Sequence, residues 1–295
     1  MRDPVLKLLR AAAALSLALL VACAPASAPH VAAPPIASPT SAIPGVSIRT
    51  IERKEPVPLV AHLVTIDLMK AGPVVVASDP APDGEGFVAT TVRDLAAHHG
   101  LSLAVNASFF EVPGGRYPVA GERADVVGGL VLDGKRAGHS GTIGGLLDGA
   151  ICFGAHTARV EKGFACDGAR WGLATGPVLL WKGARTDTAF ADAIFKSPRH
   201  PRTAAGVDAD GRTLWLLVVD GRQPGTSEGA TLDDLKDILK SAGATDAVNL
   251  DGGGSSTLVG KGPDGALKLL NVPVHEHTPG RERPVVTAVG VEDAE

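Results

Sequence analysis

Clusters of basic residues, long apolar runs and abundant cysteines are all missing from this sequence of 295 residues. Lys and Arg total 28 against 32 Asp and Glu, and the basic residues are scattered, so a nucleic acid is not an expected partner. The one extended apolar run, residues 11–23, is too short to span a membrane comfortably. What this run does instead depends on its position at the start of the chain.

The first 22 residues are typical of a bacterial export signal. Three basic residues precede the apolar run, which closes with Leu-Val-Ala-Cys at residues 20–23. That closing pattern resembles a lipobox, in which Cys23 receives lipid and becomes the mature N-terminus. The alternative is an ordinary signal peptide that happens to contain a cysteine. We predict a lipoprotein signal peptide over residues 1–22.

Residues 23–45 are predicted to form a tether between the lipid and a folded domain. Of the 21 residues from 24 to 44, 16 are Ala, Pro or Ser and none carries a formal charge. Such a segment cannot bury a core and is kept extended by its prolines. Ala24 after Cys23 is similar to the outer-membrane sorting pattern of Gram-negative lipoproteins. The expected location is therefore the cell envelope, at the outer membrane or its periplasmic face.

Residues 46–295 suit one domain, because no second linker-like stretch interrupts them. Apart from Cys23, only Cys152 and Cys166 remain. In an exported protein two cysteines this close in sequence favour a disulfide that closes a local loop. Two separate buried thiols are the alternative.

The pattern of apolar residues predicts an α+β fold: a mixed β-sheet core with a few packed helices. Helices are expected over residues 91–100 and 231–243, each begun by a capping threonine and ended by a glycine. Asp210-Gly211 predicts a tight hairpin turn. Short Val- and Leu-rich segments bounded by Gly, Pro or Asp predict strands at residues 59–68, 73–78, 101–110, 128–134, 172–181, 202–221, 246–250 and 284–291.

Three polar stretches at predicted strand ends are candidate ligand sites. Asn106 ends an apolar strand and Glu111 follows two phenylalanines, so the pair could bind a sugar hydroxyl and supply an acid or base. Asn106 could equally cap a turn while Glu111 is solvated. Arg202 precedes another strand, where its donors suit a phosphate or carboxylate, although a surface ion pair explains it equally well.

The third stretch, NLDGGGSSTLV at residues 249–259, is the most informative. Asp251 follows a predicted buried strand, and Gly252, Gly253 and Gly254 could leave room for a ligand and present N–H groups to an anion. Ser255 adds a hydroxyl. A serine nucleophile is disfavoured because the flanks lack the G-x-S-x-G pattern, and no G-K-[ST] phosphate loop is present. A plain glycine-rich hairpin is the remaining alternative.

The order of the motifs along the chain resembles the phosphodiester glycosidase family over about residues 60–292. The segments that carry the resemblance are VNASFFE, GGLVLDGK, ATGPVLLWKG, PRTAAGVDADGRTLWLLVVDGR, TLDDLKDILKSAGATDAVNLDGGGSSTLV and RERPVVTAVGV. It implies hydrolysis of the anomeric C–O bond of a sugar phosphodiester or a related envelope or extracellular glycan. The family's first motif usually reads Asn-Gly-Gly-Phe-Phe-Asp, whereas residues 106–111 read Asn-Ala-Ser-Phe-Phe-Glu, which predicts a narrower site.

Residue chemistry laid over the matching motifs then predicts individual roles. Phosphate leaves readily, so a carboxylate at the anomeric carbon and cations at the phosphate are the main needs. Asp251 is expected to act as base or nucleophile with Glu111 as its partner, and Asn106 to orient the sugar. Arg202 is expected to bind phosphate.

Further groups complete the expected phosphate site. The amides of Gly252, Gly253 and Gly254, with Ser255, would take the remaining oxygens. Arg222 and Arg283 are secondary candidates that could equally be structural.

No metal or other cofactor is predicted. Asp208, Asp220 and Asp251 all lie in or after strands, but scattered acids do not define a calcium site, and His/Cys ligand spacing is missing. His275 and His277 form an H-x-H pattern between prolines, for which a surface loop is favoured over a zinc site.

Two other functions stay open at this stage. One is a non-catalytic glycan-binding surface lipoprotein, which the altered Asn-Ala-Ser motif favours. The other is a glycosidase that acts on phosphate-free exopolysaccharide.

Overall fold

The computed structural model describes residues 43–137, 145–191 and 199–292, which belong to one compact unit. The predicted signal peptide, Cys23 and nearly all of the predicted tether lie outside these residues. Among the described helices, none has the length and apolarity needed to cross a bilayer.

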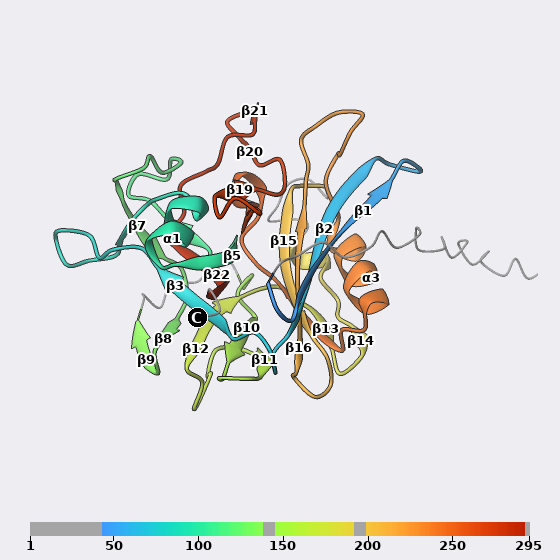
Figure 1. The fold of residues 1–295 in the computed structure, drawn as a ribbon, viewed down its shortest axis with the longest axis horizontal. Coiled ribbons are helices and arrows are strands. Elements are labelled where there is room, and N and C mark those ends of the chain that lie inside the picture. The colour runs from blue at the N-terminus through green and yellow to red at the C-terminus, as the bar shows by residue number, and fades with distance from the viewer. Residues whose placement is uncertain (1–42, 138–144, 192–198, 293–295) are drawn as a thin grey trace, which may run out of the picture. The chain divides into compact units, whose positions relative to one another are not determined.

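A seven-stranded sheet forms one side of the domain (Figure 1). Each strand pairs with its neighbours in antiparallel register, for example Arg202 opposite Val219. In spatial order its strands are β1 (Val46–Arg53), β2 (Leu59–Asp67), β16 (Thr213–Val219), β15 (Arg202–Val207), β17 (Asp246–Asn249), β13 (Val178–Trp181) and β14 (Ala184–Arg185).

Two five-stranded sheets form the rest of the core, and both are antiparallel. The first contains, in order, β11 (Ala158–Lys162), β10 (Gly149–Phe153), β12 (Trp171–Thr175), β8 (Leu130–Leu132) and β9 (Lys135–Ala137). The second contains β19 (Leu267–Leu269), β18 (Leu258–Lys261), β5 (Leu101–Asn106), β22 (Thr287–Glu292) and β3 (Pro73–Ala77).

Two small sheets lie at the edges. One contains β4 (Phe87–Val88), β7 (Arg123–Val126) and β6 (Phe110–Glu111), and the other is the hairpin of β20 (Val274–His275) and β21 (Thr278–Pro279).

The structure corrects the predicted fold class in two respects, the share of helix and the direction of the strands. The described chain is mostly β-sheet with few helices, and every pair of named strands is antiparallel. Antiparallel neighbours can be joined by short turns, whereas parallel pairs need long crossovers. The β15–β16 turn is an example. Asp208 closes it by accepting hydrogen bonds from the amides of Arg212 and Thr213, and Gly211 takes the only positive φ, +65°.

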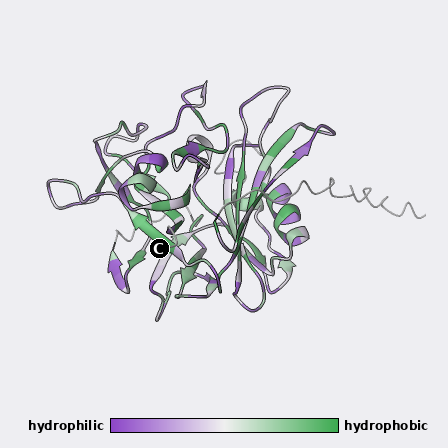
Figure 2. Cartoon of the chain, in the orientation of Figure 1, coloured by the Kyte–Doolittle hydropathy of each residue, from purple (hydrophilic) through white to green (hydrophobic). Residues whose placement is uncertain are grey.

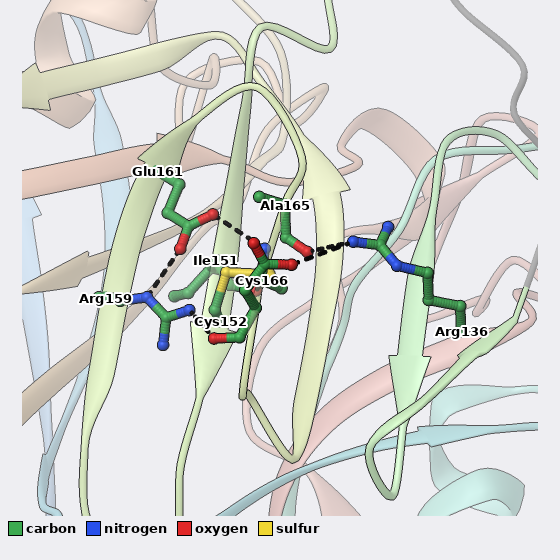
Figure 3. The surroundings of a disulfide bond; sticks show 8 residues. Arg136, Ile151, Cys152, Arg159, Glu161, Ala165 and Cys166 are labelled. Carbon is green, nitrogen blue, oxygen red and sulfur yellow. Dashed lines mark hydrogen bonds and ion pairs between the residues drawn. A yellow bond between two sulfur atoms is a disulfide. The ribbon is translucent and has the colours of Figure 1, made fainter.

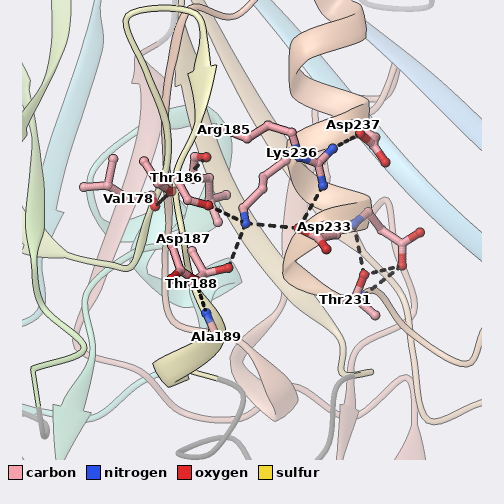
Figure 4. Close-up of polar contacts among 12 residues, drawn as sticks. Val178, Arg185, Thr186, Asp187, Thr188, Ala189, Thr231, Asp233, Lys236 and Asp237 are labelled. Carbon is pink, nitrogen blue, oxygen red and sulfur yellow. Dashed lines mark hydrogen bonds and ion pairs between the residues drawn. The ribbon is translucent and has the colours of Figure 1, made fainter. Parts of the chain in front are cut away.

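The two predicted helices are present. Helix α1 (Val92–His98) is capped by Thr91, and α3 (Leu232–Ala242) begins with a reciprocal capping box of Thr231 and Asp234. Helix α3 packs on one face of the seven-stranded sheet, and Leu235 and Leu239 are buried there. Figure 4 shows its buried Lys236 donating to the carbonyl of Thr186 and to the Thr188 hydroxyl.

Alternation along the strands gives the large sheet two apolar faces. On β16, Leu214, Leu216 and Val218 belong to the main core shared with the two five-stranded sheets. Leu217 and Val219 point to the opposite face, beneath α3. Figure 2 shows hydrophobic residues along the strands of the domain.

A disulfide joins Cys152 on β10 to Cys166 in the turn that follows β11. Figure 3 shows how polar contacts surround it. Glu161 accepts from the amide of Cys166 at 2.9 Å and pairs with Arg159 at 2.7 Å. Arg136, on β9, donates to the carbonyl of Ala165. The bond therefore stabilises the sheet formed by β8 to β12, and none of these contacts involves the NLDGGGSSTLV segment.

Candidate active site

The NLDGGGSSTLV segment crosses from one sheet to another. Strand β17 ends at Asn249 in the seven-stranded sheet, and β18 begins at Leu258 beside β5 in a different sheet. Asp251 therefore lies where the chain leaves the first sheet, and its amide donates to the carbonyl of Ala107, just after β5. The crossing places a partly buried carboxyl group at the junction of two strand ends.

Asn106 holds this crossing in place. Its Nδ2 donates to the carbonyl of Asp251 at 2.6 Å, and its Oδ1 accepts from the Thr203 hydroxyl and the Thr257 amide. The side chain is completely buried. Both ends of the amide are thus engaged by protein groups, so Asn106 ties β5, β15 and the crossing together instead of facing a sugar.

At each of the three glycine positions, a side chain would clash with a different neighbouring group or strain the backbone. A Cβ on Gly252 would lie 3.0 Å from the carbonyl oxygen of Pro201. Gly253 has φ +64°, a region that favours glycine, and a Cβ there would lie 3.0 Å from Arg222 Nη2. A Cβ on Gly254 would lie only 2.7–2.9 Å from the Arg283 guanidinium. The glycines therefore admit two arginines to the main chain of this segment.

These two arginines form the cationic part of the site. Arg283 is buried, with Nε 3.4 Å from His275 Nδ1 and Nη1 3.4 Å from Ser255 Oγ, while its guanidinium lies 4.4 Å from the centre of the Tyr117 ring. Arg222 is exposed and donates to the carbonyl of Val274. Among the described residues, neither arginine has a carboxylate within 4.0 Å.

Burial and charge set the ionisation of the site. Desolvation raises the pKa of Asp251, and the charge of Arg283 with hydrogen bonds from Ser255 and the Gly252 amide oppose that rise. Partial desolvation by the surrounding protein lowers the pKa of Arg222 although the residue is exposed, and the nearby charge of Arg283 lowers it further. Two cations held close without a carboxylate partner favour an anionic ligand.

Other predicted binding groups lie elsewhere or are already occupied. Glu111 is exposed on β6 opposite Asp125, and no hydrogen bond or ion pair among the described residues joins it to Asp251. Arg202 is fully buried against Gly252, and its Nε donates to the carbonyl of Ala230. Both residues therefore lack the exposed, converging geometry that the sequence suggested.

The predicted nest of glycine amides is also largely occupied. The Gly252 N–H donates to the Asp251 carboxylate at 2.8 Å, and the Gly253 N–H donates to the carbonyl of Pro201. Two of the three amides therefore orient the segment. In the altered first motif, the Ser108 side chain is also occupied by protein. Its buried hydroxyl forms a hydrogen bond with the Thr287 hydroxyl on β22 at 2.6 Å.

The H-x-H segment is not a surface loop but a tight hairpin, which corrects the sequence interpretation. His275 pairs with Thr278, and Glu276 and His277 form the turn with φ of 48° and 60°. His275 is therefore buried against Arg283, while His277 is exposed at the turn. Tyr117, the only tyrosine in the chain, was not predicted to be at the site, because nothing near it in sequence resembles a motif.

Two of the three aspartates considered as metal ligands have structural roles of their own, away from Asp251. Asp208 closes its own hairpin, and Asp220 accepts from Asn271 Nδ2 and the Val272 amide at 3.0 Å each, with His62 at 3.4 Å. Asn271 in turn donates to the carbonyl of Ser256. In the described part of the chain, the one His/Cys/Asp/Glu cluster of metal-binding dimensions is Cys152, Glu161 and Cys166, whose cysteines form the disulfide.

A carboxyl group on the same segment as the contacts of two arginines that have no carboxylate of the described residues within 4.0 Å is an arrangement suited to an anionic ligand. The phosphodiester glycosidase family model matches residues 99–292, so the chain belongs to that family. The matched region includes Asp251 and both arginines.

Individual relatives are more distant. The bovine N-acetylglucosamine-1-phosphodiester alpha-N-acetylglucosaminidase is 27% identical over 198 residues, which is 60% of this chain and 35% of that protein. A Bacillus subtilis prophage-derived uncharacterized protein, YomE, is 39% identical over 94 residues, 27% of this chain and 14% of that protein. The chain thus spans about a third or less of the length of these relatives.

Solved structures share the fold. The catalytic domain of zebrafish N-acetylglucosamine-1-phosphodiester alpha-N-acetylglucosaminidase superposes with a TM-score of 0.63 at 20% identity, covering 86% of this chain and 85% of that one. A hypothetical protein from Synechocystis superposes with a TM-score of 0.54 at 16% identity, covering 88% and 64%.

Proposed function

We propose that this chain hydrolyses the anomeric C–O bond of a sugar phosphodiester at the Asp251 crossing. One observation carries the proposal. A partly buried carboxyl group of raised pKa lies on the same short segment as the two glycines that receive Arg222 and Arg283. Membership of the phosphodiester glycosidase family supports the same reaction class.

In this proposal Asp251 acts at the anomeric carbon, as a base toward water or as a nucleophile. A raised pKa brings a carboxyl group closer to the pH at which it can take up and release a proton during catalysis. Ser255 and the Gly252 amide hold the carboxylate in one orientation. Glu111, exposed on β6, is not required, because a departing phosphate needs little help from a general acid.

Phosphate binding is assigned to Arg222 and Arg283. Their guanidinium groups are the cations next to Gly253 and Gly254, and they would neutralise the departing phosphate. Arg202 supports the main chain of Gly252 from within the core, and Asn106 fixes the position of Asp251. The last two residues are therefore positioning residues in this mechanism.

The test compares the full-length chain with Asp251→Ala and a matched control, Asp264→Asn, which alters an exposed carboxylate paired with Lys268. The substrates are UDP-N-acetylglucosamine and a simple α-N-acetylglucosaminyl phosphodiester. We expect turnover by the parent and the control, and its loss in a folded Asp251→Ala variant. Turnover by Asp251→Ala at the parent rate contradicts the assignment.

Phosphate-free glycosides separate the remaining possibilities. Hydrolysis of nitrophenyl glycosides at rates equal to the phosphodiesters would favour the exopolysaccharide glycosidase. Binding of glycans without turnover of any substrate would favour the non-catalytic lipoprotein. The two arginines without carboxylate partners favour the phosphodiester, since a neutral glycoside has no group that needs them.

We also propose that the chain is exported and anchored through lipid on Cys23, from the signal and lipobox patterns in the first 23 residues. The expected product has the mass of residues 23–295 plus lipid and fractionates with membranes. A Cys23→Ser variant that is still processed and still membrane-bound would contradict lipid anchoring.

A further inference from the structure

A large aromatic ring is exposed at the edge of the arginine pair. Tyr117 is 54% exposed although its ring packs on the Arg283 guanidinium at 4.4 Å and meets the His275 ring edge-on at 5.4 Å. A tyrosine ring has a large apolar body and a polar tip, so it can contact both a ligand ring and the surrounding water. Val272, which is 39% exposed, lies three residues before His275 and adds apolar surface on the hairpin side.

Hydrogen bonds within and around the loop of residues 112–122 hold the Tyr117 ring in its position. The Gly115 amide donates to the carbonyl of Val112, and the Gly121 amide donates to the carbonyl of Ala89. Arg116 forms two parallel hydrogen bonds with Glu122, at 2.7 and 2.8 Å. Tyr117 follows Arg116 directly, so this paired contact fixes the residue that carries the ring.

The site therefore has a buried wall and an exposed wall. Asp251 and Ser255 lie on the buried crossing, Tyr117 lies at the exposed side, and Arg283 contacts both the crossing and the ring. In a glycosyl phosphodiester, the anomeric carbon and the alcohol occupy different ester oxygens of the phosphate. If Asp251 reaches the anomeric carbon and the arginines hold the phosphate, the alcohol extends away from Asp251 toward the exposed wall.

We propose that Tyr117 is a specificity-determining residue that stacks on a ring carried by the alcohol part of the phosphodiester. The preferred substrates are then diesters whose alcohol is a sugar or an aromatic ring, in preference to diesters of small acyclic alcohols. Ring-on-ring and sugar-on-aromatic contacts use the flat apolar face that Tyr117 presents. This inference rests on the proposed function for its orientation, but the binding it predicts can be measured without turnover.

The first measurement uses the single tyrosine of the chain as a probe. Full-length protein labelled with 3-fluorotyrosine gives one fluorine resonance, which reports on Tyr117 alone. We expect phenyl phosphate and glucose 6-phosphate to shift this resonance more than methyl phosphate or inorganic phosphate does. Equal shifts with all four compounds, or no shift at saturation, would overturn the proposal.

The second measurement compares affinities in variants by calorimetry. We expect the parent to bind phenyl phosphate about fivefold more tightly than methyl phosphate, and Tyr117→Ala to abolish that preference. Tyr117→Phe should retain it, because the ring and its packing on Arg283 remain. The control is Val119→Ala, which removes another exposed apolar side chain from the same loop and should change nothing.

Kinetics then separate this inference from the proposed function. With phenyl and methyl diesters of the same sugar, Tyr117→Ala should raise KM for the phenyl diester alone, with kcat nearly unchanged. If the parent hydrolyses both diesters and Tyr117→Ala leaves both KM values unchanged, Tyr117 does not select the alcohol although the proposed function stands. If no diester is hydrolysed but phenyl phosphate binding depends on Tyr117, the ring site stands and the proposed hydrolysis fails.

Discussion

Gly254→Ala is predicted to damage the site more than its small size suggests. The added methyl would lie 2.7 Å from Nη2 and 2.9 Å from Cζ of Arg283. Ordinary van der Waals contact begins at 3.4 Å, so the guanidinium must retreat by about 0.7 Å. The retreat has little room, because Ser255, His275 and Tyr117 also contact this group.

Two magnitudes follow from that displacement. Overpacking a buried contact of this kind costs about 2 kcal/mol of unfolding free energy, which lowers Tm by about 6 °C in a domain of this size. A misplacement approaching 1 Å of a phosphate-binding group lowers kcat/KM by about 100-fold. The catalytic loss is therefore expected to exceed what the loss of folded protein explains.

The assay measures kcat/KM for an α-N-acetylglucosaminyl phosphodiester together with a thermal unfolding scan. Gly72→Ala is the matched control, since Gly72 is exposed and its Cβ would meet its nearest atom at 3.7 Å. We expect the control to match the parent in both measurements. If Gly254→Ala also stays within about threefold of the parent in kcat/KM, Arg283 does not hold the reacting group and the site has been placed wrongly.

Three further predictions concern stability. Asp251→Asn should abolish hydrolysis yet raise Tm at pH 7: burial raises the pKa of Asp251, so ionisation of this group destabilises the fold as the pH rises through its folded-state pKa. The gain should vanish below the unfolded-state pKa, and a gain constant from pH 3 to 8 would contradict this. Replacing Cys152 and Cys166 by Ser should lower the unfolding free energy by about 3 kcal/mol in urea titrations, with kcat/KM within twofold. Thr231→Ala should cost about 1 kcal/mol by loss of the capping box, whereas Thr231→Ser should be nearly neutral.

Local signals in the sequence predicted the helices well. Capping depends on residues within one turn of each other, so Thr91 and Thr231 marked the helix starts without reference to the rest of the chain. Most of the expected strands are present for the same reason, since alternation and turn residues act locally. The arrangement of those strands in several antiparallel sheets was not predicted, because pairing depends on contacts between distant segments.

Strands with weak apolar patterns were missed. Residues 46–50 alternate β-branched and polar side chains, but the alternation stops at Ile51, and the structure pairs residues 46–53 with β2 over their whole length. Residues 158–162 carry three charges among five residues and still form β11. In both cases an existing strand supplies the hydrogen-bonding partner, so pairing overrides a weak local preference.

In the candidate site, too, local sequence predicted some features and contacts between distant segments decided the others. The chain by itself determined that Asp251 follows a buried strand and opens a segment of three glycines, which with the order of the other motifs indicated the family. Tertiary structure alone decided which cations reach that segment. Arg202 was the expected phosphate ligand, but it is buried beneath Gly252, while Arg222 and Arg283 arrive from distant segments.

Tyr117 shows why local sequence could not predict the whole site. Its sequence neighbours predict only a loop, and its ring becomes part of a site because Arg283 and His275 pack against it. Local sequence sets backbone preferences, since those depend on a few adjacent residues. The meeting of side chains from three separate segments depends on how the sheets pack, which no short stretch of the chain encodes.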